Sequence, residues 1–343
     1  MQIHENFSLK PYNTFSIEAK ARIFASFFSV EDLEEYIMMF SQHPILILGG
    51  GSNILLTKDY EGVVLKNEIT GVDVQHEDEE HVYVKVGAGE NWHQFVLHCI
   101  KHNWAGIENL SLIPGNVGAS PIQNIGAYGV ELDDVFWSLE AYHISERRIH
   151  TFTRTDCEFG YRDSIFKNRY KGEFVILSVT LQLRKKPIFH TSYGAITEEL
   201  EKMKVKDLSI QAISQAVINI RSSKLPDPKL IPNAGSFFKN PEVPVSQYEE
   251  LKKKFPDIVA YPLTKLTVKL AAGWMIEQCG PDKIGTSWKG YRKNDAGCHA
   301  RQALVLVNYG NAKGSEIYDL SEQILKSVSK KFKVSLEREV NII

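Results

Sequence analysis

The sequence has few cysteines, and their spacing indicates no disulfide or metal-binding pair. Four occur among 343 residues, at Cys99, Cys157, Cys279 and Cys298, and no C-x-x-C motif is present. Nothing therefore indicates a secreted disulfide framework, and a reducing cytoplasm is the expected location. The eleven histidines are scattered without H-E-x-x-H or similar spacing, so no metal site is predicted.

Long apolar runs and a strong charge bias are also missing. No stretch approaches the roughly 18 uninterrupted apolar residues of a membrane helix, and the start, MQIHENFSLKPYNTF, lacks a signal-peptide pattern. The formal net charge is only −2, whereas a nucleic-acid-binding protein usually presents a basic face. No nucleic-acid or membrane partner is expected, and nothing demands more than a monomer. Length and a hydrophobic content of 43% fit a globular protein of two or three domains.

Hydrophobic periodicity predicts a mixture of helices and strands. Ser29 is a plausible cap for the first helix, and the helix over 210–220 should end before LPDP at 225–228, because two prolines cannot continue it. That point is the predicted domain boundary. The predicted helices cover 30–40, 92–99, 210–220, 266–279 and 317–328. The predicted strands cover 45–48, 63–65, 82–86, 139–144, 174–183, 303–307 and 332–343.

Two glycine-rich loops are the strongest local signals. GGGSN at 49–53 follows a predicted strand directly, and such a loop can turn its N–H groups toward a phosphate or can be a tight turn without a ligand. The segment 107–130 is long, glycine-rich and nearly uncharged, which indicates something packed closely against its backbone. Neither loop has the G-x-G-x-x-G or Walker A pattern. Together they fit a large cofactor laid between two small subdomains.

The sequence of these loops resembles one enzyme family. GGGSN and IPGNVGASPIQNIGAYG are similar to the FAD-binding halves of the UDP-N-acetylenolpyruvoylglucosamine reductases, within the vanillyl-alcohol-oxidase-like flavoproteins. The likeness covers nearly the whole chain in the expected order. It includes YNTF at 12–15, GYRDS at 160–164, KLPDP at 224–228, AGSFFKNP at 234–241 and LEREV at 336–340.

The resemblance implies an α+β fold with three parts. A two-subdomain FAD-binding fold of the vanillyl-alcohol-oxidase type is expected over 1–68 and 69–222, followed by a C-terminal α/β substrate-binding domain over 223–329. The tail 330–343 is expected to pack back near the active site. Tyr193 marks the longer subclass of these reductases, in which a tyrosine loop closes over the nucleotide.

The same resemblance implies non-covalent FAD, with NADPH as the hydride donor. Since no dinucleotide-binding fold is present, NADPH and the UDP-sugar are expected to use one cleft in turn, which predicts ping-pong kinetics. The residues expected at the pyrophosphate are Gly49, Gly50, Gly51, Ser52 and Asn53. Those expected along the flavin ring are Pro114, Gly115, Gly118, Ala119, Ser120, Gln123, Asn124, Gly126, Ala127 and Tyr128.

The family's reaction reduces the enol ether of UDP-N-acetylenolpyruvoylglucosamine to UDP-N-acetylmuramate, a peptidoglycan precursor. Hydride passes from the flavin to the vinyl carbon, and charge grows on the neighbouring carboxylate. Arg162 suits that carboxylate because a guanidinium offers a planar fork of donors that matches a carboxylate. Ser236 corresponds to the family's proton donor, and Glu339 to its stabilising or relaying carboxyl, with Glu337 as the rival position. Asn341 departs from the arginine of many relatives, which leaves the packing of the tail open.

Substrate binding is expected from a group of polar and charged residues, since the two phosphates attract cations. They are Tyr193, Arg221, Lys224, Gly235, Lys239 and Asn240, with Gln302 as a weaker candidate. Two alternatives stay open from the sequence. One is another FAD-dependent oxidase of the same fold, and the other is a nucleotide-sugar binding protein without turnover.

Overall fold

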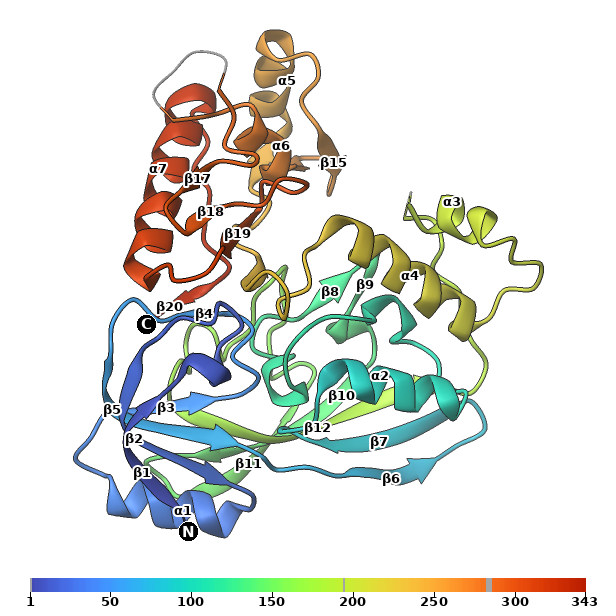
Figure 1. Cartoon of the computed structure of the whole chain (residues 1–343). Coiled ribbons are helices and arrows are strands. Elements are labelled where there is room, and N and C mark those ends of the chain that lie inside the picture. Colours follow the sequence, from blue (N-terminus) through green and yellow to red (C-terminus); the bar gives the residue numbers. More distant parts are fainter. Residues whose placement is uncertain (1, 194, 282–285) are drawn as a thin grey trace. The chain divides into compact units, whose positions relative to one another are not determined.

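The computed structural model describes residues 2–193, 195–281 and 286–343 (Figure 1). The chain divides into two units, each made of several segments. Unit 1 comprises Met1–Phe7, Ala21–Gly51 and Glu61–Ser223, and unit 2 comprises Ser8–Lys20, Ser52–Tyr60 and Lys224–Ile343. Among the described residues, no helix has both the length and the apolar character that crossing a membrane requires.

Unit 1 is built on two sheets. One has the strand order β1-β2-β5-β3, and the other is antiparallel with the order β11-β10-β12-β7-β6. The strands are β1 (Ile3–Ser8), β2 (Lys20–Phe27), β3 (Ile45–Leu48), β5 (Tyr60–Asn67), β6 (Val72–Glu77), β7 (His81–Gly87), β10 (Phe136–His143), β11 (Arg148–Thr153) and β12 (Phe174–Arg184). A short pair, β8 (Gly126–Ala127) with β9 (Val130–Glu131), lies in the second glycine-rich loop.

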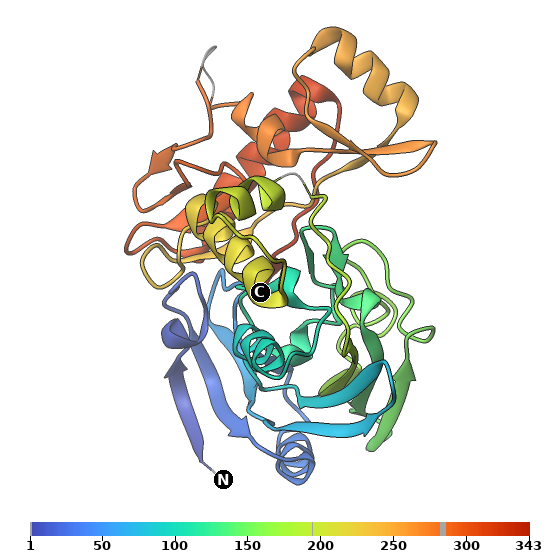
Figure 2. The same cartoon turned by 90° about the vertical axis from the view of Figure 1, so that its right-hand side faces the viewer.

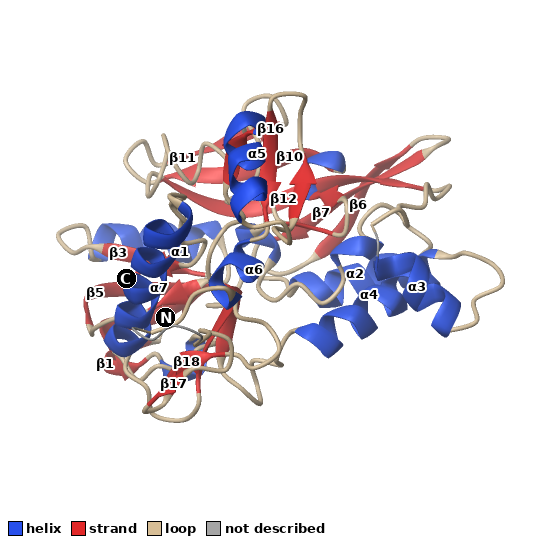
Figure 3. Ribbon diagram, turned by 90° about the horizontal axis from the view of Figure 1, so that it is seen from above, coloured by secondary structure: helices blue, strands red, loops and turns tan. Residues whose placement is uncertain are grey.

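Apolar faces place the first two helices of unit 1 on these sheets. In α1 (Val30–Met39), Leu33 and Ile37 pack with residues of β2 and β5, and the Ser29 hydroxyl accepts the Asp32 N–H at 3.1 Å, as the cap prediction requires. In α2 (Trp92–Lys101), one face is buried and packs in a cluster with residues of the five-stranded sheet, which Figure 3 shows beside the helix. The buried side chains of this face are Trp92, Phe95, Val96 and Cys99. The loop that follows α2 contains three 3-10 turns, which are Glu108–Leu110, Val117–Ala119 and Leu132–Asp134.

A helical hairpin completes unit 1. It consists of α3 (Ala195–Lys202) and α4 (Ile210–Lys224), which lie side by side in Figure 2. Their apolar side chains form a cluster of their own. Helix α4 begins where the periodicity predicts and ends immediately before Leu225 and Pro226. The predicted stop at the two prolines is therefore confirmed.

Unit 2 holds a four-stranded sheet, a three-stranded sheet, one two-stranded parallel pair and one long helix. The first sheet has the order β13-β19-β18-β17 and the second the order β14-β16-β15. Helix α7 (Gly314–Phe332) buries Ile317, Leu320, Ile324 and Val328 as predicted, and it lies beside β18 and β19 in Figure 1. The other elements are the turn Lys10–Tyr12, β4 (Ile54–Leu55), β13 (Asn233–Ser236), β14 (Glu242–Pro244), α5 (Val245–Lys254), β15 (Ala260–Pro262), β16 (Thr267–Leu270), α6 (Ala272–Glu277), β17 (Arg292–Lys293), β18 (Ala296–Cys298), β19 (Val305–Asn308) and β20 (Asn341–Ile342).

Two predicted elements of unit 2 are wrong. The helix predicted over 266–279 is strand β16 followed by the shorter α6, because the β-branched Thr267 and Val268 pair with β14 and β15. The strand predicted over 332–343 is mostly not a strand. Helix α7 runs on through Phe332, and only β20 forms a ladder, parallel to β4. Buried and exposed residues alternate from Phe332 to Leu336, as they would in a strand, but this stretch forms no strand.

Candidate functional site

The two glycine-rich loops, far apart in the sequence, meet inside unit 1. A Cβ atom added to Gly50 would lie 2.8 Å from the Gly115 Cα and 2.9 Å from the Asn116 Oδ1. A Cβ added to Gly118 would lie 2.5 Å from that of Ala88. Such distances leave no room for any side chain. Glycine at position 50 therefore permits the close backbone approach that joins the loops, and Gly118 lets the second loop pack on Ala88.

The first loop has the geometry of an anion nest. Gly51 lies in the left-handed region, with φ of 61°. In the part of the chain that the structure describes, no protein acceptor takes the backbone N–H groups of Gly50 and Gly51. Unpaired N–H groups in successive residues are the donors that bind phosphate oxygens. The boundary between the units falls just after this nest, between Gly51 and Ser52.

The second loop is held by left-handed residues and by its own side chains. Asn124 and Tyr128 have φ values of 41° and 52°. The Asn124 amide donates to the Glu131 carboxylate at 2.8 Å and to the Gly160 carbonyl at 3.1 Å, and its oxygen accepts the Asp133 N–H. Ser120 is also buried, and its hydroxyl donates to the Val117 carbonyl at 2.6 Å. These side chains shape the loop, which leaves the backbone and the small side chains to face a ligand.

The remaining residues predicted to bind the cofactor lie along the same loop of unit 1. Gly115 and Gly129 have positive φ, and Gly126 and Ala127 form β8. Pro114 and Ala119 are exposed, whereas Gln123 and Tyr128 are half-buried. The whole set is thereby brought to one stretch of irregular backbone.

Arg162 reaches this loop from the GYRDS motif. Its guanidinium donates to the Gly126 carbonyl and, at 3.4 Å, to the Asn124 carbonyl. The Glu131 carboxylate lies 3.8 Å away, and the side chain is 17% exposed. The guanidinium also lies over the Tyr161 ring, 5.1 Å from its centroid. Arg162 is thus fixed against the loop that the sequence predicts to line the flavin.

A second group of residues in unit 1 consists of one cation, Arg221, and two aromatic rings, Tyr128 and Tyr193. The Tyr128 and Tyr193 rings meet edge to face with centroids 5.8 Å apart. Burial lowers the pKa of Arg221, and the charge of Arg162 lowers it further, whereas Tyr128 raises it. The Arg221 Nε is buried and has no hydrogen-bond partner among the described residues. A buried donor without a partner marks a place where a ligand oxygen would be stabilised.

His93 belongs to this region but was missed in the sequence. Its Nδ1 accepts the Leu112 N–H at 3.0 Å, and Leu112 itself has φ of 59°. Burial, and then the charge of Arg221, lowers the pKa of His93. The ring is therefore held in its neutral form with the proton on Nε2. A histidine on an amphipathic helix carries no distinguishing pattern, so only the structure reveals it.

In unit 2, Ser236 and Glu339 lie on neighbouring segments. Ser236 ends β13 opposite Val305 of β19, after Gly235, whose φ is 70° and whose N–H bonds the Asn233 side chain at 2.8 Å. The Glu339 N–H donates to the Phe237 carbonyl at 2.9 Å. One backbone hydrogen bond thus joins the predicted carboxyl to the residue that follows the predicted proton donor.

Asn53 and Asn341 hold the tail of unit 2 in place. The Asn53 side chain donates to the Glu339 carbonyl at 3.1 Å. The Asn53 carbonyl accepts both the backbone and the side-chain N–H groups of Asn341, each at 3.0 Å. Asn341 therefore has a structural role, because it fixes the tail to Asn53.

The rival carboxyl and the predicted cations differ in their surroundings. Glu337 is 68% exposed on its side chain and pairs with the Lys239 Nζ at 2.7 Å, whereas Glu339 is half-buried. The Asn240 side-chain oxygen accepts the Ala272 N–H at 2.9 Å and so caps α6. Lys224 is exposed at the end of α4, and the Gln302 side-chain oxygen accepts the Leu304 N–H. Glu337 is the less sheltered of the two carboxylates.

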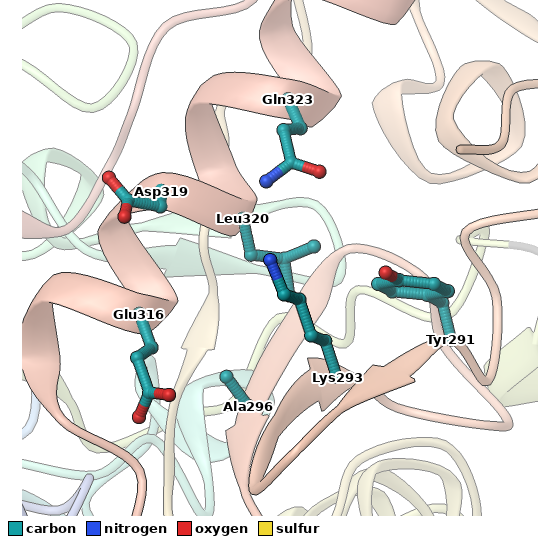
Figure 4. Close-up of a pocket in the computed structure, with 7 residues that line it drawn as sticks. All are labelled: Tyr291, Lys293, Ala296, Glu316, Asp319, Leu320 and Gln323. Carbon is teal, nitrogen blue, oxygen red and sulfur yellow. The ribbon is translucent and has the colours of Figure 1, made fainter. Parts of the chain in front are cut away.

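A small cavity in unit 2 has none of these residues in its lining. Its volume of about 70 Å³ suits a few waters rather than a dinucleotide. Figure 4 shows its lining between α7 and the β17–β18 hairpin, with none of the predicted site residues among them. Its lining residues are Tyr291, Lys293, Ala296, Glu316, Asp319, Leu320 and Gln323.

Two family models match the chain. The FAD binding domain matches residues 22–146, and the C-terminal domain of UDP-N-acetylenolpyruvoylglucosamine reductase matches residues 227–343. Curated proteins named UDP-N-acetylenolpyruvoylglucosamine reductase are similar over the full length. The chain is 49% identical to that of Flavobacterium johnsoniae and 51% identical to that of Amoebophilus asiaticus, with 100% of both chains covered in each case.

A solved structure has the same fold. The UDP-N-acetylenolpyruvylglucosamine reductase from Thermus caldophilus matches with a TM-score of 0.68 at 21% identity, covering 100% of this chain and 99% of that one. At this identity the likeness concerns the fold alone. With the two family models, it confirms the predicted fold class, an α+β FAD-binding fold joined to a C-terminal domain.

Proposed function

The chain belongs to the UDP-N-acetylenolpyruvoylglucosamine reductase family, and we propose that it reduces UDP-N-acetylenolpyruvoylglucosamine to UDP-N-acetylmuramate. The reaction uses NADPH and FAD and supplies a precursor of peptidoglycan. The observation that carries the proposal is the identity of 49% with the Flavobacterium johnsoniae reductase over the full length of both chains. The residues of each unit fit this chemistry in separate ways.

The cradle of unit 1 fits FAD. Gly50 and Gly51 offer N–H groups to the pyrophosphate, with Gly49, Ser52 and Asn53 beside them. The uncharged backbone from Pro114 to Tyr128 suits a flat ring, whose edge atoms can bond main-chain amides. Bound FAD supplies hydride transfer from NADPH to the vinyl carbon of the substrate.

Arg162 is proposed to bind the carboxylate of the substrate. Two carbonyls already orient its guanidinium, so little side-chain freedom is lost when the carboxylate binds. Its charge stabilises the enolate-like oxygen as negative charge develops there. Because the arginine is fixed before the reaction begins, no reorganisation is needed at that moment.

Ser236 is proposed to donate the proton to the neighbouring carbon. A serine hydroxyl is a weak acid, so the strongly basic enolate carbon must supply the driving force. Glu339 is proposed to stabilise the intermediate or relay the proton. Its backbone bond to Phe237 keeps the two segments in register. Glu337 is the poorer choice because it is exposed and paired with Lys239.

The UDP-sugar is proposed to bind through its phosphates and nucleotide. Arg221 contributes a buried donor without a protein partner, and the Tyr193 ring rests against Tyr128. Lys239 would exchange some of its pairing with Glu337 for a phosphate. Lys224, Gly235 and Asn240 complete the proposed set. NADPH is proposed to use the same site in turn.

Three organisational features are also proposed. The working parts are 1–68 and 69–222 for FAD and 223–329 for the substrate, with the tail 330–343 beside the active site. The enzyme is proposed to act as a monomer in the cytoplasm. The four cysteines support a reducing compartment, because all are buried and unpaired.

The test is direct. Purified protein, NADPH and UDP-N-acetylenolpyruvoylglucosamine are mixed, and the loss of nicotinamide absorbance is followed with initial rates over both substrates. We expect turnover that depends on the UDP-sugar, with parallel double-reciprocal lines. Intersecting lines would contradict the shared site. Rapid oxygen consumption that ignores the UDP-sugar would instead indicate an oxidase, and a colourless protein that takes up no FAD would end the proposal.

A further inference from the structure

A short buried polar segment of unit 1 contacts three parts of the proposed site. Residues 108–112 follow α2, and the side chains of Glu108, Asn109 and Ser111 are almost wholly buried. The Ser111 hydroxyl is 2.8 Å from that of Ser214 on α4, the helix that carries Arg221. The Leu112 N–H donates to His93. Buried polar groups of this kind are costly unless they are paired, so their partners define the role of the segment.

Asn109 makes the most specific of these contacts. Its side-chain nitrogen donates to the Tyr128 carbonyl at 3.0 Å and to the His190 carbonyl at 2.9 Å. Both partners are carbonyls, so the orientation of the amide is fixed without ambiguity. The side chain is only 1% exposed. One amide group thus joins the loop proposed to line the flavin to the segment that leads into Tyr193.

Among the described residues, these two carbonyls are the hydrogen-bond partners of the Asn109 side chain. Its Oδ1 is buried and has no hydrogen-bond partner among the described residues, so the side chain carries the cost of one unmet acceptor. The neighbouring Glu108 carboxylate accepts the Gly106 N–H at 2.7 Å, and burial raises the pKa of Glu108, which the nearby His190 offsets only in part. Tyr193 then rests its ring on that of Tyr128. Contacts at both ends of the 190–193 stretch therefore dock it on the same loop.

We propose that Asn109 is a positioning residue for recognition of the UDP-sugar, acting through the Tyr193 segment and not by touching the reactants. The inference rests on the proposed function and deepens it. Without the two donors, the His190 and Tyr128 carbonyls lose their common partner, and the Tyr193 ring is no longer presented in one place. Affinity for the nucleotide should fall, whereas the flavin chemistry should continue once substrate is bound.

The test compares Asn109→Leu with a matched control, Asn67→Leu. Asn67 is also a buried amide of unit 1, and it donates to the Ile176 carbonyl at 3.0 Å and accepts the Ile69 N–H at 3.1 Å. We expect Asn109→Leu to raise the KM for the UDP-sugar about tenfold, as the loss of two neutral hydrogen bonds implies, with kcat within about twofold of wild type. Asn67→Leu should lower the melting temperature comparably and leave KM unchanged.

Two further measurements separate this role from general destabilisation. Amide hydrogen exchange over residues 186–193 should accelerate in Asn109→Leu and not in Asn67→Leu. FAD absorbance and anaerobic reduction by NADPH should persist in both variants. If Asn109→Leu does not fold, Asn109→Ser is measured in the same way. Its hydroxyl has a single hydrogen and can donate to only one of the two carbonyls.

Clear outcomes overturn the inference. An unchanged KM in folded Asn109 variants, or an equal rise in KM in Asn67→Leu, would reduce Asn109 to an ordinary core residue. Unchanged exchange over 186–193 would do the same. Failure of wild-type turnover is a different result, because it rejects the proposed function before any variant is compared.

Discussion

The two units hold their functional residues by different means. In unit 1 most of them lie on irregular loops fixed by left-handed backbone and by buried amides such as Asn109 and Asn124. In unit 2, Ser236 and Glu339 lie on nearly extended segments joined by backbone hydrogen bonds. A loop that must approach a flat cofactor depends on particular side chains, whereas a backbone pairing tolerates most side chains. Substitutions in the two units should therefore fail in distinguishable ways.

The largest effect is expected from Ser236→Ala in unit 2. Removal of a proton donor should lower kcat about 10³-fold, the usual size for general acid catalysis. FAD content and reduction by NADPH should remain, because those steps do not need the hydroxyl. Stopped-flow absorbance separates the two half-reactions. Ser246→Ala, at an exposed position of α5, is the control, and unchanged turnover in Ser236→Ala would assign the proton to another group.

Gly50→Ala in unit 1 should produce the opposite pattern. The new methyl would lie 2.8 Å from the Gly115 Cα, and such overpacking corresponds to at least about tenfold weaker FAD binding. Gly49→Ala meets only the Asn116 Cβ, at 4.0 Å, and should lose much less. Titration of apoprotein with FAD measures both. Equal losses would mean that the close approach of the loops does not matter.

Asn53→Ala tests the residue that connects the glycine-rich loop to the tail. The change removes the bond to the Glu339 carbonyl, and we expect kcat to fall about fivefold, as one hydrogen bond implies. Affinity for FAD should change less. The measurement is kcat beside the dissociation constant of FAD. A loss of FAD affinity with normal kcat would assign Asn53 to the cofactor alone.

The smallest effect concerns pH and Glu108. Burial raises the pKa of this carboxyl above its ordinary value, so the folded protein holds the proton more tightly than the unfolded chain. That contribution to stability is present below the ordinary pKa and is lost as the pH rises through the raised value. Glu108→Gln stays neutral throughout. Its melting temperature should therefore gain on wild type as the pH rises above about pH 4, the ordinary pKa of a glutamate, and a constant difference would contradict this account.

Much of the fold was predictable from periodicity. Helices α1, α2, α4 and α7 show clear apolar faces, and the Ser29 cap and the proline stop after α4 mark their ends. The errors at 266–279 and 332–343 arose because short segments take their conformation from distant partners. Thr267 pairs with β14 and β20 pairs with β4, and no local pattern encodes such pairings.

The candidate site was predicted mainly through resemblance. Glycine-rich sequence alone indicated the two loops but not their meeting at Gly50 and Gly115. His93 and Asn109 were missed for a physical reason. Each acts through hydrogen bonds to backbone groups of other segments. In the sequence, such a residue cannot be distinguished from any other polar residue in an apolar stretch.

The segmented make-up of unit 2 has a consequence for protein engineering. The Phe15 ring packs edge to face on the Phe237 ring, with centroids 6.2 Å apart, and the Phe15 carbonyl accepts the Asn308 side chain at 2.9 Å. A hybrid enzyme spliced at Lys224 would take Phe237 and Asn308 from one parent and Phe15 from the other. Recombination between distant relatives should therefore yield active chimeras only when the crossover also carries residues 8–20 and 52–60 from the parent that supplies the C-terminal part.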